Sequence, residues 1–195
     1  MSTTATPSTL EQQRAAFARR RLIATPLAGM IAWLIVGLSG LFLPDTTTVW
    51  ILYIATGCIA YLGIFISRFT GENFLDKSRP SNTFDRLFFL TVGQSLLTYA
   101  IAIPFALQDY SSLPLTVGIL TGTMWLPMSW IIHHWVGLFH GLTRTVLVVL
   151  LWYLLPEWRF VAIPFAIVAV YAVTIYVLEQ RYRRQPLYAS RELER

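Results

Sequence analysis

The sequence predicts an all-α protein, a polytopic transmembrane bundle of six helices. Three observations support this fold class. First, 55% of the 195 residues are hydrophobic and only 13% are charged, whereas a soluble domain carries about 25% charged residues. Second, the apolar residues gather in long runs, and roughly 20 such residues cross the hydrocarbon layer of a membrane. Third, the basic residues lie between these runs, as is typical of charges that orient membrane proteins.

Five of the predicted spans follow directly from the apolar runs, at residues 22–43, 49–67, 87–107, 113–132 and 160–178. The first run follows a basic segment, as in a signal peptide. It is longer than the roughly 7–15 apolar residues of a signal, so we predict a retained helix. The resulting organisation is a cytoplasmic tail (1–21), a transmembrane domain (22–178) and a second cytoplasmic tail (179–195).

The remaining span, fifth in chain order, requires a separate argument. Only eleven residues lie between Arg144 and Pro156, whereas a span needs roughly 20. The helix must therefore begin near Val136 or Gly137, and it must contain Arg144. A very short turn around His133 is then expected to separate it from the fourth span.

The placement of lysine and arginine predicts the orientation of the bundle. With both termini on the inside, 14 of the 15 basic residues lie on that side, and Arg159 is the exception. Positive charges favour the cytoplasmic side. We therefore predict cytoplasmic termini and insertion in a membrane with a negative inner face, such as a bacterial inner membrane.

The three predicted outer turns share a feature, because each carries an acidic residue: Asp45, Asp109 and Glu157. Similar intervals separate these acids from the next inner charge or histidine. One interpretation is a bundle of three parallel helical hairpins, related by an internal repeat. The alternative is that any six-helix protein with short outer turns shows this pattern.

A glycine-rich stretch followed by Leu-Pro and aromatic residues runs from Gly118 to Trp130, with the sequence GILTGTMWLPMSW. This stretch resembles a helix of an uncharacterised family of small bacterial six-helix integral membrane proteins. The resemblance covers the second to sixth predicted helices. It implies a compact membrane domain of unknown function, and it carries over no catalytic or binding residue.

Arg144 is the most informative single residue, because its position in the fifth span is close to the middle of the bilayer. An ionisable residue at that depth usually faces a cavity or a partner. The alternative is that its long side chain reaches to the inner headgroups. Trp33 and Trp125 also fall deep in their spans, where their indole N–H groups need packing or hydrogen-bond partners.

A candidate binding site can be assembled around this arginine. His140 lies one helical turn before Arg144, so the two share a face. Gln94, Thr98 and Tyr99 of the third span fall at a similar depth. We expect these five residues to form a polar pocket that opens to the cytoplasm and binds an anionic group.

Three functional classes stay open at this point. The first is a small transporter or channel for an anionic solute or a lipid headgroup. The second is a membrane-embedded enzyme that uses His133, His134 and His140, which are the only histidines and an alternative set of metal ligands. The third is a non-catalytic membrane scaffold.

No nucleotide-binding or hydrolase motif is present in the sequence. We therefore expect no catalytic residues and no metal or other cofactor. The expected partners are membrane lipids and a small anionic solute, with a homo-oligomer open and no nucleic acid.

Overall fold

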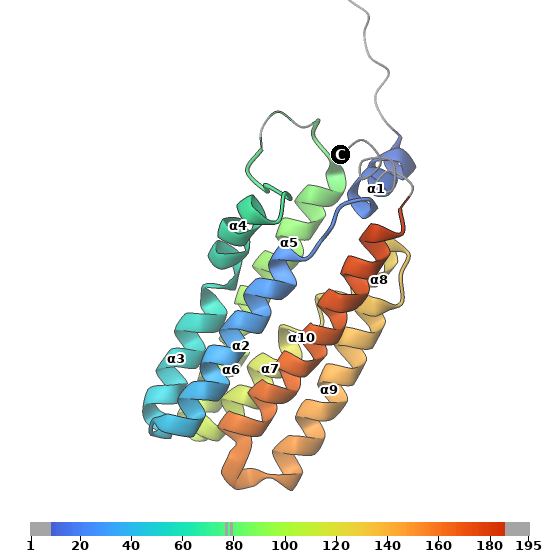
Figure 1. Ribbon diagram of the computed structural model, residues 1–195. Coiled ribbons are helices and arrows are strands. Elements are labelled where there is room, and N and C mark those ends of the chain that lie inside the picture. The colour runs from blue at the N-terminus through green and yellow to red at the C-terminus, as the bar shows by residue number, and fades with distance from the viewer. Residues whose placement is uncertain (1–8, 77, 79, 186–195) are drawn as a thin grey trace, which may run out of the picture.

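The computed structural model describes residues 9–76, 78 and 80–185. Within these ranges the chain forms helices and no strands (Figure 1). The helices are α1 (Leu10–Ala18), α2 (Ala24–Phe42), α3 (Asp45–Gly57), α4 (Ile59–Phe69), α5 (Thr83–Leu97), α6 (Tyr99–Gln108), α7 (Leu113–Leu120), α8 (Trp125–Ile132), α9 (Val136–Leu154) and α10 (Arg159–Arg183), with short 3-10 helices η1 (Tyr110–Ser112) and η2 (Pro156–Trp158). The predicted all-α fold class is confirmed. The basic residues predicted on the inside at positions 77, 79, 191 and 195 lie outside the described residues.

The described helices match the predicted spans closely. Five helical segments are long and apolar enough to cross a membrane: α2, residues 83–108, residues 110–132, α9, and residues 156–183. A sixth arises if α3 and α4, which meet at an angle of 52°, count as one span. The fifth predicted helix does begin at Val136, as the distance between Arg144 and Pro156 requires.

Three of the six spans are interrupted near their middle. The interruptions lie between α3 and α4 at Cys58, between α5 and α6 at Thr98, and between α7 and α8 at residues 121–124. Proline explains the last one, because Pro127 cannot donate a backbone hydrogen bond and its ring crowds the carbonyl four residues earlier. At the same break, the Thr121 hydroxyl donates to the Val117 carbonyl at 2.6 Å, which leaves its lone pairs free to accept.

The helices are arranged as three hairpins (Figure 1). The turns that join α2 to α3, α6 to α7 and α9 to α10 all lie at one end of the bundle, which we call the hairpin end. The opposite end holds α1, residues 70–76 and 80–82, and residues 133–135, and we call it the loop end. The predicted hairpin arrangement thus matches the described fold, with the acids Asp45, Asp109 and Glu157 at the hairpin end.

The core of the bundle forms around α10, which packs on α2 on one side and on α9 on the other. Helix α2 packs against α10, α3 and α4, while α9 packs against α7, α8 and α10. Close contact between α2 and α10 requires glycine, because a side chain at Gly40 would collide with the backbone of Phe160. Helices α5 and α6 pack mainly against α1, α7 and each other, and little of their surface is buried.

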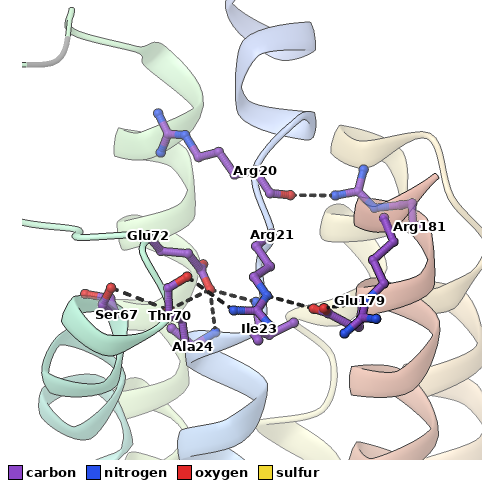
Figure 2. A network of polar contacts seen from close by, with 10 residues as sticks. Arg20, Arg21, Ile23, Ala24, Ser67, Thr70, Glu72, Glu179 and Arg181 are labelled. Atoms are coloured by element: carbon purple, nitrogen blue, oxygen red, sulfur yellow. Dashed lines mark hydrogen bonds and ion pairs between the residues drawn. The ribbon is translucent and has the colours of Figure 1, made fainter. Parts of the chain in front are cut away.

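The loop end is held together by polar contacts that the sequence did not reveal (Figure 2). The predicted tail 1–21 contains α1, which packs on α5 and α8 and buries Phe17. Arg181 of α10 donates to the backbone carbonyls of Ala18 at 2.6 Å and Arg20 at 2.8 Å. These bonds fix the chain between α1 and α2.

Glu72 anchors the loop between α4 and α5 to the start of α2. Its Oε1 accepts from the backbone N–H groups of Ile23 at 2.9 Å and Ala24 at 2.8 Å (Figure 2). The first N–H groups of a helix have no partner within the helix, and a carboxylate there also interacts favourably with the helix dipole. Glu72 therefore caps α2.

Candidate functional site

Arg144 lies inside the bundle, near the middle of α9. It is eight residues from Val136 and ten from Leu154, or roughly 12 and 15 Å from the two helix ends at 1.5 Å per residue. Its side chain has an exposed fraction of 0%. The guanidinium thus faces the interior of the protein and does not extend to the headgroups.

Hydroxyl groups and aromatic rings surround this guanidinium. Its Nη1 donates to the Tyr171 hydroxyl at 3.2 Å and its Nη2 donates to Thr121 Oγ1 at 2.8 Å. Its central carbon lies 5.3 Å from the ring centre of Trp33 and 5.6 Å from that of Tyr171. Rings at these distances attract a cation, so α2, α7, α9 and α10 all contribute to holding the charge.

No carboxylate pairs with Arg144 among the residues that the structure describes. The side-chain ion pairs found there are Arg14–Glu11, Arg20–Asp85, Arg21–Glu179 and Arg183–Glu179, and all lie at the loop end. The Nε of Arg144 also lacks an acceptor within the described chain. The hydroxyls and rings stabilise the cation, but its charge is not neutralised.

Space beside this Nε depends on glycine. A Cβ built on Gly122 would lie 3.1 Å from Arg144 Cδ and 3.2 Å from Nε, closer than side chains normally approach. Glycine at position 122 therefore lets the backbone pack directly against this part of the arginine side chain. The Nε–H donor is buried there.

His140 lies one turn before Arg144 and is also fully buried. Its Nδ1 lies 2.9 Å from Thr174 Oγ1, while the Thr174 hydroxyl donates to the Val170 carbonyl at 2.8 Å. The single hydroxyl proton is thus used, so Thr174 accepts from the imidazole and Nδ1 carries the proton. In the neutral ring Nε2 is then an acceptor.

Aromatic stacking joins His140 to the arginine. The imidazole stacks on Trp125 with ring centres 4.3 Å apart and meets the Tyr171 ring edge-on at 4.6 Å. Like Arg144 Nε, the indole nitrogens of Trp33 and Trp125 are buried and have no acceptor in the described chain. We call this group the arginine cluster: Trp33, Thr121, Trp125, His140, Arg144, Tyr171 and Thr174.

The structure brings together only part of the predicted pocket. Arg144 and His140 share Tyr171 as a neighbour, but none of the three predicted residues of the third span is a hydrogen-bond partner of either. Gln94 is exposed, the Thr98 hydroxyl donates to the Ser95 carbonyl at 2.7 Å, and the Tyr99 hydroxyl bonds Thr56 Oγ1. Depth along a helix predicted these residues, whereas the rotation of α5 and α6 determines which neighbours they meet.

The residues that complete the cluster were only partly foreseeable. Trp33 and Trp125 were expected to need partners at depth. Tyr171 and Thr174 are polar residues three positions apart in the last span, so they share a helix face, and this spacing is the signal that would have found them.

The three histidines do not converge. His133 is exposed and ends α8 in a left-handed conformation with φ of 49°, and the His134 ring lies beside its own backbone, where Nδ1 accepts from Val136 N–H at 3.3 Å. Only His140 lies in the bundle interior. Within the described ranges, no three His, Cys, Asp or Glu side chains come close enough to hold a metal ion.

Two cavities lead to the arginine cluster. The larger has a volume of about 300 Å³ and opens at the loop end between α1, α5, α8 and residues 72–76 and 80–82. The smaller has a volume of about 40 Å³ and is lined by Thr121 and Tyr171, the two hydrogen-bond partners of Arg144. Thr25, Met124 and Trp125 line both cavities, so these three residues form the partition between them.

All three helix interruptions border the smaller cavity. Its walls include Gly57 and Ile59 on either side of the break between α3 and α4, Tyr99 at the break between α5 and α6, and Met124 at the break between α7 and α8. Irregular backbone within a membrane is tolerated where it is buried in protein or lines a cavity. The interruptions therefore concentrate polar backbone groups around the cluster.

No curated protein and no solved structure matches this chain. Residues 10–181 match a family of unknown function, DUF7010, a range that includes the whole arginine cluster. The predicted resemblance to an uncharacterised family is thus confirmed, while bacterial origin stays a prediction. The chain belongs to the DUF7010 family of unknown function.

Proposed function

We propose that this protein is a small membrane transport protein whose arginine cluster binds the anionic group of a solute. The observation that carries the proposal is Arg144: a fully buried cation with no carboxylate partner among the described residues, whose hydrogen-bond partners Thr121 and Tyr171 line a cavity. A charge buried without a partner costs several kcal/mol. A bound anion offsets that cost.

The donors around the site suit an anion. Arginine stays charged when desolvated, and its planar fork matches a carboxylate or phosphate. The buried Nε–H of Arg144 and the indole N–H groups of Trp33 and Trp125 are further donors without acceptors in the described chain. A ligand with several hydrogen-bond acceptors, such as an anion, would satisfy these donors.

The architecture supports transport as the use of this site. Many transporters bind their substrate near the bilayer midplane, between internal repeats and beside discontinuous helices. Here residues from all three hairpins line the smaller cavity, and the interrupted helices of two of them border it. The larger cavity leads to it from the loop end. The placement of basic residues favours a cytoplasmic loop end in a bacterial inner membrane, so solute would reach the cluster from the cytoplasm.

The test compares the purified wild type with Arg144→Lys and Arg144→Leu in thermal unfolding, with chloride, nitrate, phosphate, acetate and octanoate as probes. We expect at least one anion to stabilise the wild type, the Lys form to respond more weakly because it lacks the fork, and the Leu form not to respond. The same series of anions is then assayed for uptake into proteoliposomes.

Arg159→Leu is the matched control. Arg159 also lies over a tryptophan ring, at 4.0 Å from that of Trp152, and donates to a hydroxyl, Ser111 Oγ, at 2.6 Å. It lies at the hairpin end, so its loss should leave the response to anions intact. Identical responses of all forms to every anion would refute the proposal and leave Arg144 as a structural residue.

A further inference from the structure

The larger cavity differs in chemistry from the arginine cluster. Its mouth at the loop end carries charged groups of both signs, Arg20 and Arg86 together with Glu72, Asp76 and Asp85. Further along α5 and α8 the lining is apolar, with Phe88, Met124, Trp125 and Met128 among its residues. A solute that moves from the loop end toward Arg144 therefore passes an apolar section before it meets the donors of the cluster.

We propose that the solute is a monocarboxylate with an apolar body, whose carboxylate binds at Arg144 while its body occupies the inner part of the larger cavity. This inference rests on the proposed function and specifies its substrate class. The two cavities share Thr25, Met124 and Trp125, so a single molecule that displaces the flexible Met124 side chain reaches from one into the other.

Charge balance selects a monoanion. The cluster has one cation and no carboxylate among the described residues, and the imidazole of His140 already donates from Nδ1 to Thr174. A single negative charge leaves the site neutral, whereas a dianion leaves a net buried charge, which is costly at low dielectric. A carboxylate also fits the edge formed by Nε–H and one terminal nitrogen of arginine, the bidentate geometry common to such pairs.

The apolar section selects an organic body. A hydrated inorganic ion gains nothing from the apolar walls formed by Phe88, Met124 and Met128, whereas each CH₂ group removed from water there tightens binding by roughly fourfold. A volume of about 300 Å³ is at the lower end of ligand pockets. It accommodates a small organic acid and is too small for a complete membrane lipid.

The experiment measures ligand-induced thermal stabilisation by butyrate, hexanoate and octanoate, with 1-octanol and phosphate as comparison probes. We expect apparent affinity to rise by roughly fourfold for each CH₂ group that enters the cavity, with octanol and phosphate much weaker than octanoate. Arg144→Leu should remove the advantage of octanoate over octanol. Non-specific detergent-like effects of octanoate would persist in that variant and are thereby separated.

A second variant tests where the apolar body binds. Thr91 lines the larger cavity from α5, and its hydroxyl bonds only the nearby Phe88 carbonyl, so Thr91→Phe should fold and narrow the cavity. It should weaken octanoate binding by tenfold or more and leave butyrate nearly unchanged. Thr116→Phe is the matched control, because Thr116 makes the same kind of local bond on α7 and lines neither cavity.

The possible outcomes distinguish failure of the substrate class from failure of the proposed function. If butyrate, octanoate and phosphate bind equally well and all depend on Arg144, the anion site stands and the apolar-body inference is wrong. If octanoate and octanol bind equally well and neither depends on Arg144, the proposed function itself is wrong. Unchanged octanoate binding in Thr91→Phe would also refute the assignment of the larger cavity.

Discussion

The arginines at the loop end and the arginine in the centre of the bundle are held in different ways. Arg20 reaches Asp85 with both terminal nitrogens, and Arg21 Nε bonds Glu179 at 2.7 Å. Both pairs are partly exposed. Arg144 is fully buried, and its partners are two hydroxyls and two aromatic rings.

The difference shows what a neutral set of partners achieves. Partly exposed ion pairs are screened by water and contribute little to stability, but they leave no charge unbalanced. A carboxylate beside Arg144 would neutralise it permanently and occupy its donors. Hydroxyls and rings stabilise the cation while its charge stays available, which is what a site for an exchangeable anion requires.

The largest change in anion binding is expected when Arg144 is given a carboxylate partner like those of the arginines at the loop end. In Thr121→Asp, a carboxylate replaces the hydroxyl that lies 2.8 Å from Arg144 Nη2. We expect the protein to remain folded and its stabilisation by anions to be lost, because the internal ion pair replaces the ligand. Thermal unfolding with and without octanoate measures both quantities.

Thr121→Asn is the control for this variant, since it has a similar size and a carbonyl acceptor but no charge. It should keep most of the response to anions. A wild-type response in Thr121→Asp would mean that the charge of Arg144 is not what the ligand meets.

A smaller effect, on the pH dependence of stability, is expected at Glu72, the one buried carboxylate of the loop-end contacts described above. Burial raises the pKa of Glu72 above its ordinary value of 4.5, and the N–H groups of Ala24 and Ile23, the Thr70 hydroxyl and Arg21 oppose that rise only in part. Because this pKa is raised in the folded state, the contribution of Glu72 to the free energy of unfolding is greatest below pH 4.5. That contribution falls as pH rises through the folded-state pKa.

Glu72→Gln keeps a carbonyl oxygen for the N–H groups of α2 and removes the titration. The melting temperature of the variant relative to that of the wild type should therefore increase as pH rises from about 4.5 toward 8. Unfolding curves over this pH range measure the trend. The opposite slope would mean that attraction to Arg21 and to the start of α2 outweighs the cost of burial.

The smallest effect is expected at the Arg21–Glu179 pair. Glu179→Gln should reduce stability by about 1 kcal/mol or less, because the side chains are 33% and 20% exposed and water screens the pair. In roughly 1 M salt, where the screening length is about 3 Å, the difference should nearly vanish. The Glu179→Gln variant should be stabilised by anions as much as the wild type is. A weaker stabilisation by anions would link the loop-end ion pairs to the binding site.

Much of the fold could be predicted because the thickness of a bilayer sets a minimum length for each helix that crosses it. The eleven residues between Arg144 and Pro156 are too few for a span, so the helix had to begin near Val136 and had to carry Arg144 to mid-depth. The same length argument found the other spans and the hairpin turns. It did not foresee α1 packed on the bundle, because the segment 1–21 has no apolar run and depends on a few contacts such as Phe17.

Only the depth of the candidate site along the helices could be predicted from the sequence. Span length and helix periodicity are enough to place Arg144 and His140 deep in one helix and on one face of it. That Tyr171 and Thr121, and not Gln94, meet the guanidinium follows from the packing of the folded helices. Helix rotation and packing depend on how side chains from distant segments fit together, as where Gly122 leaves room beside Arg144, and no local pattern encodes that fit.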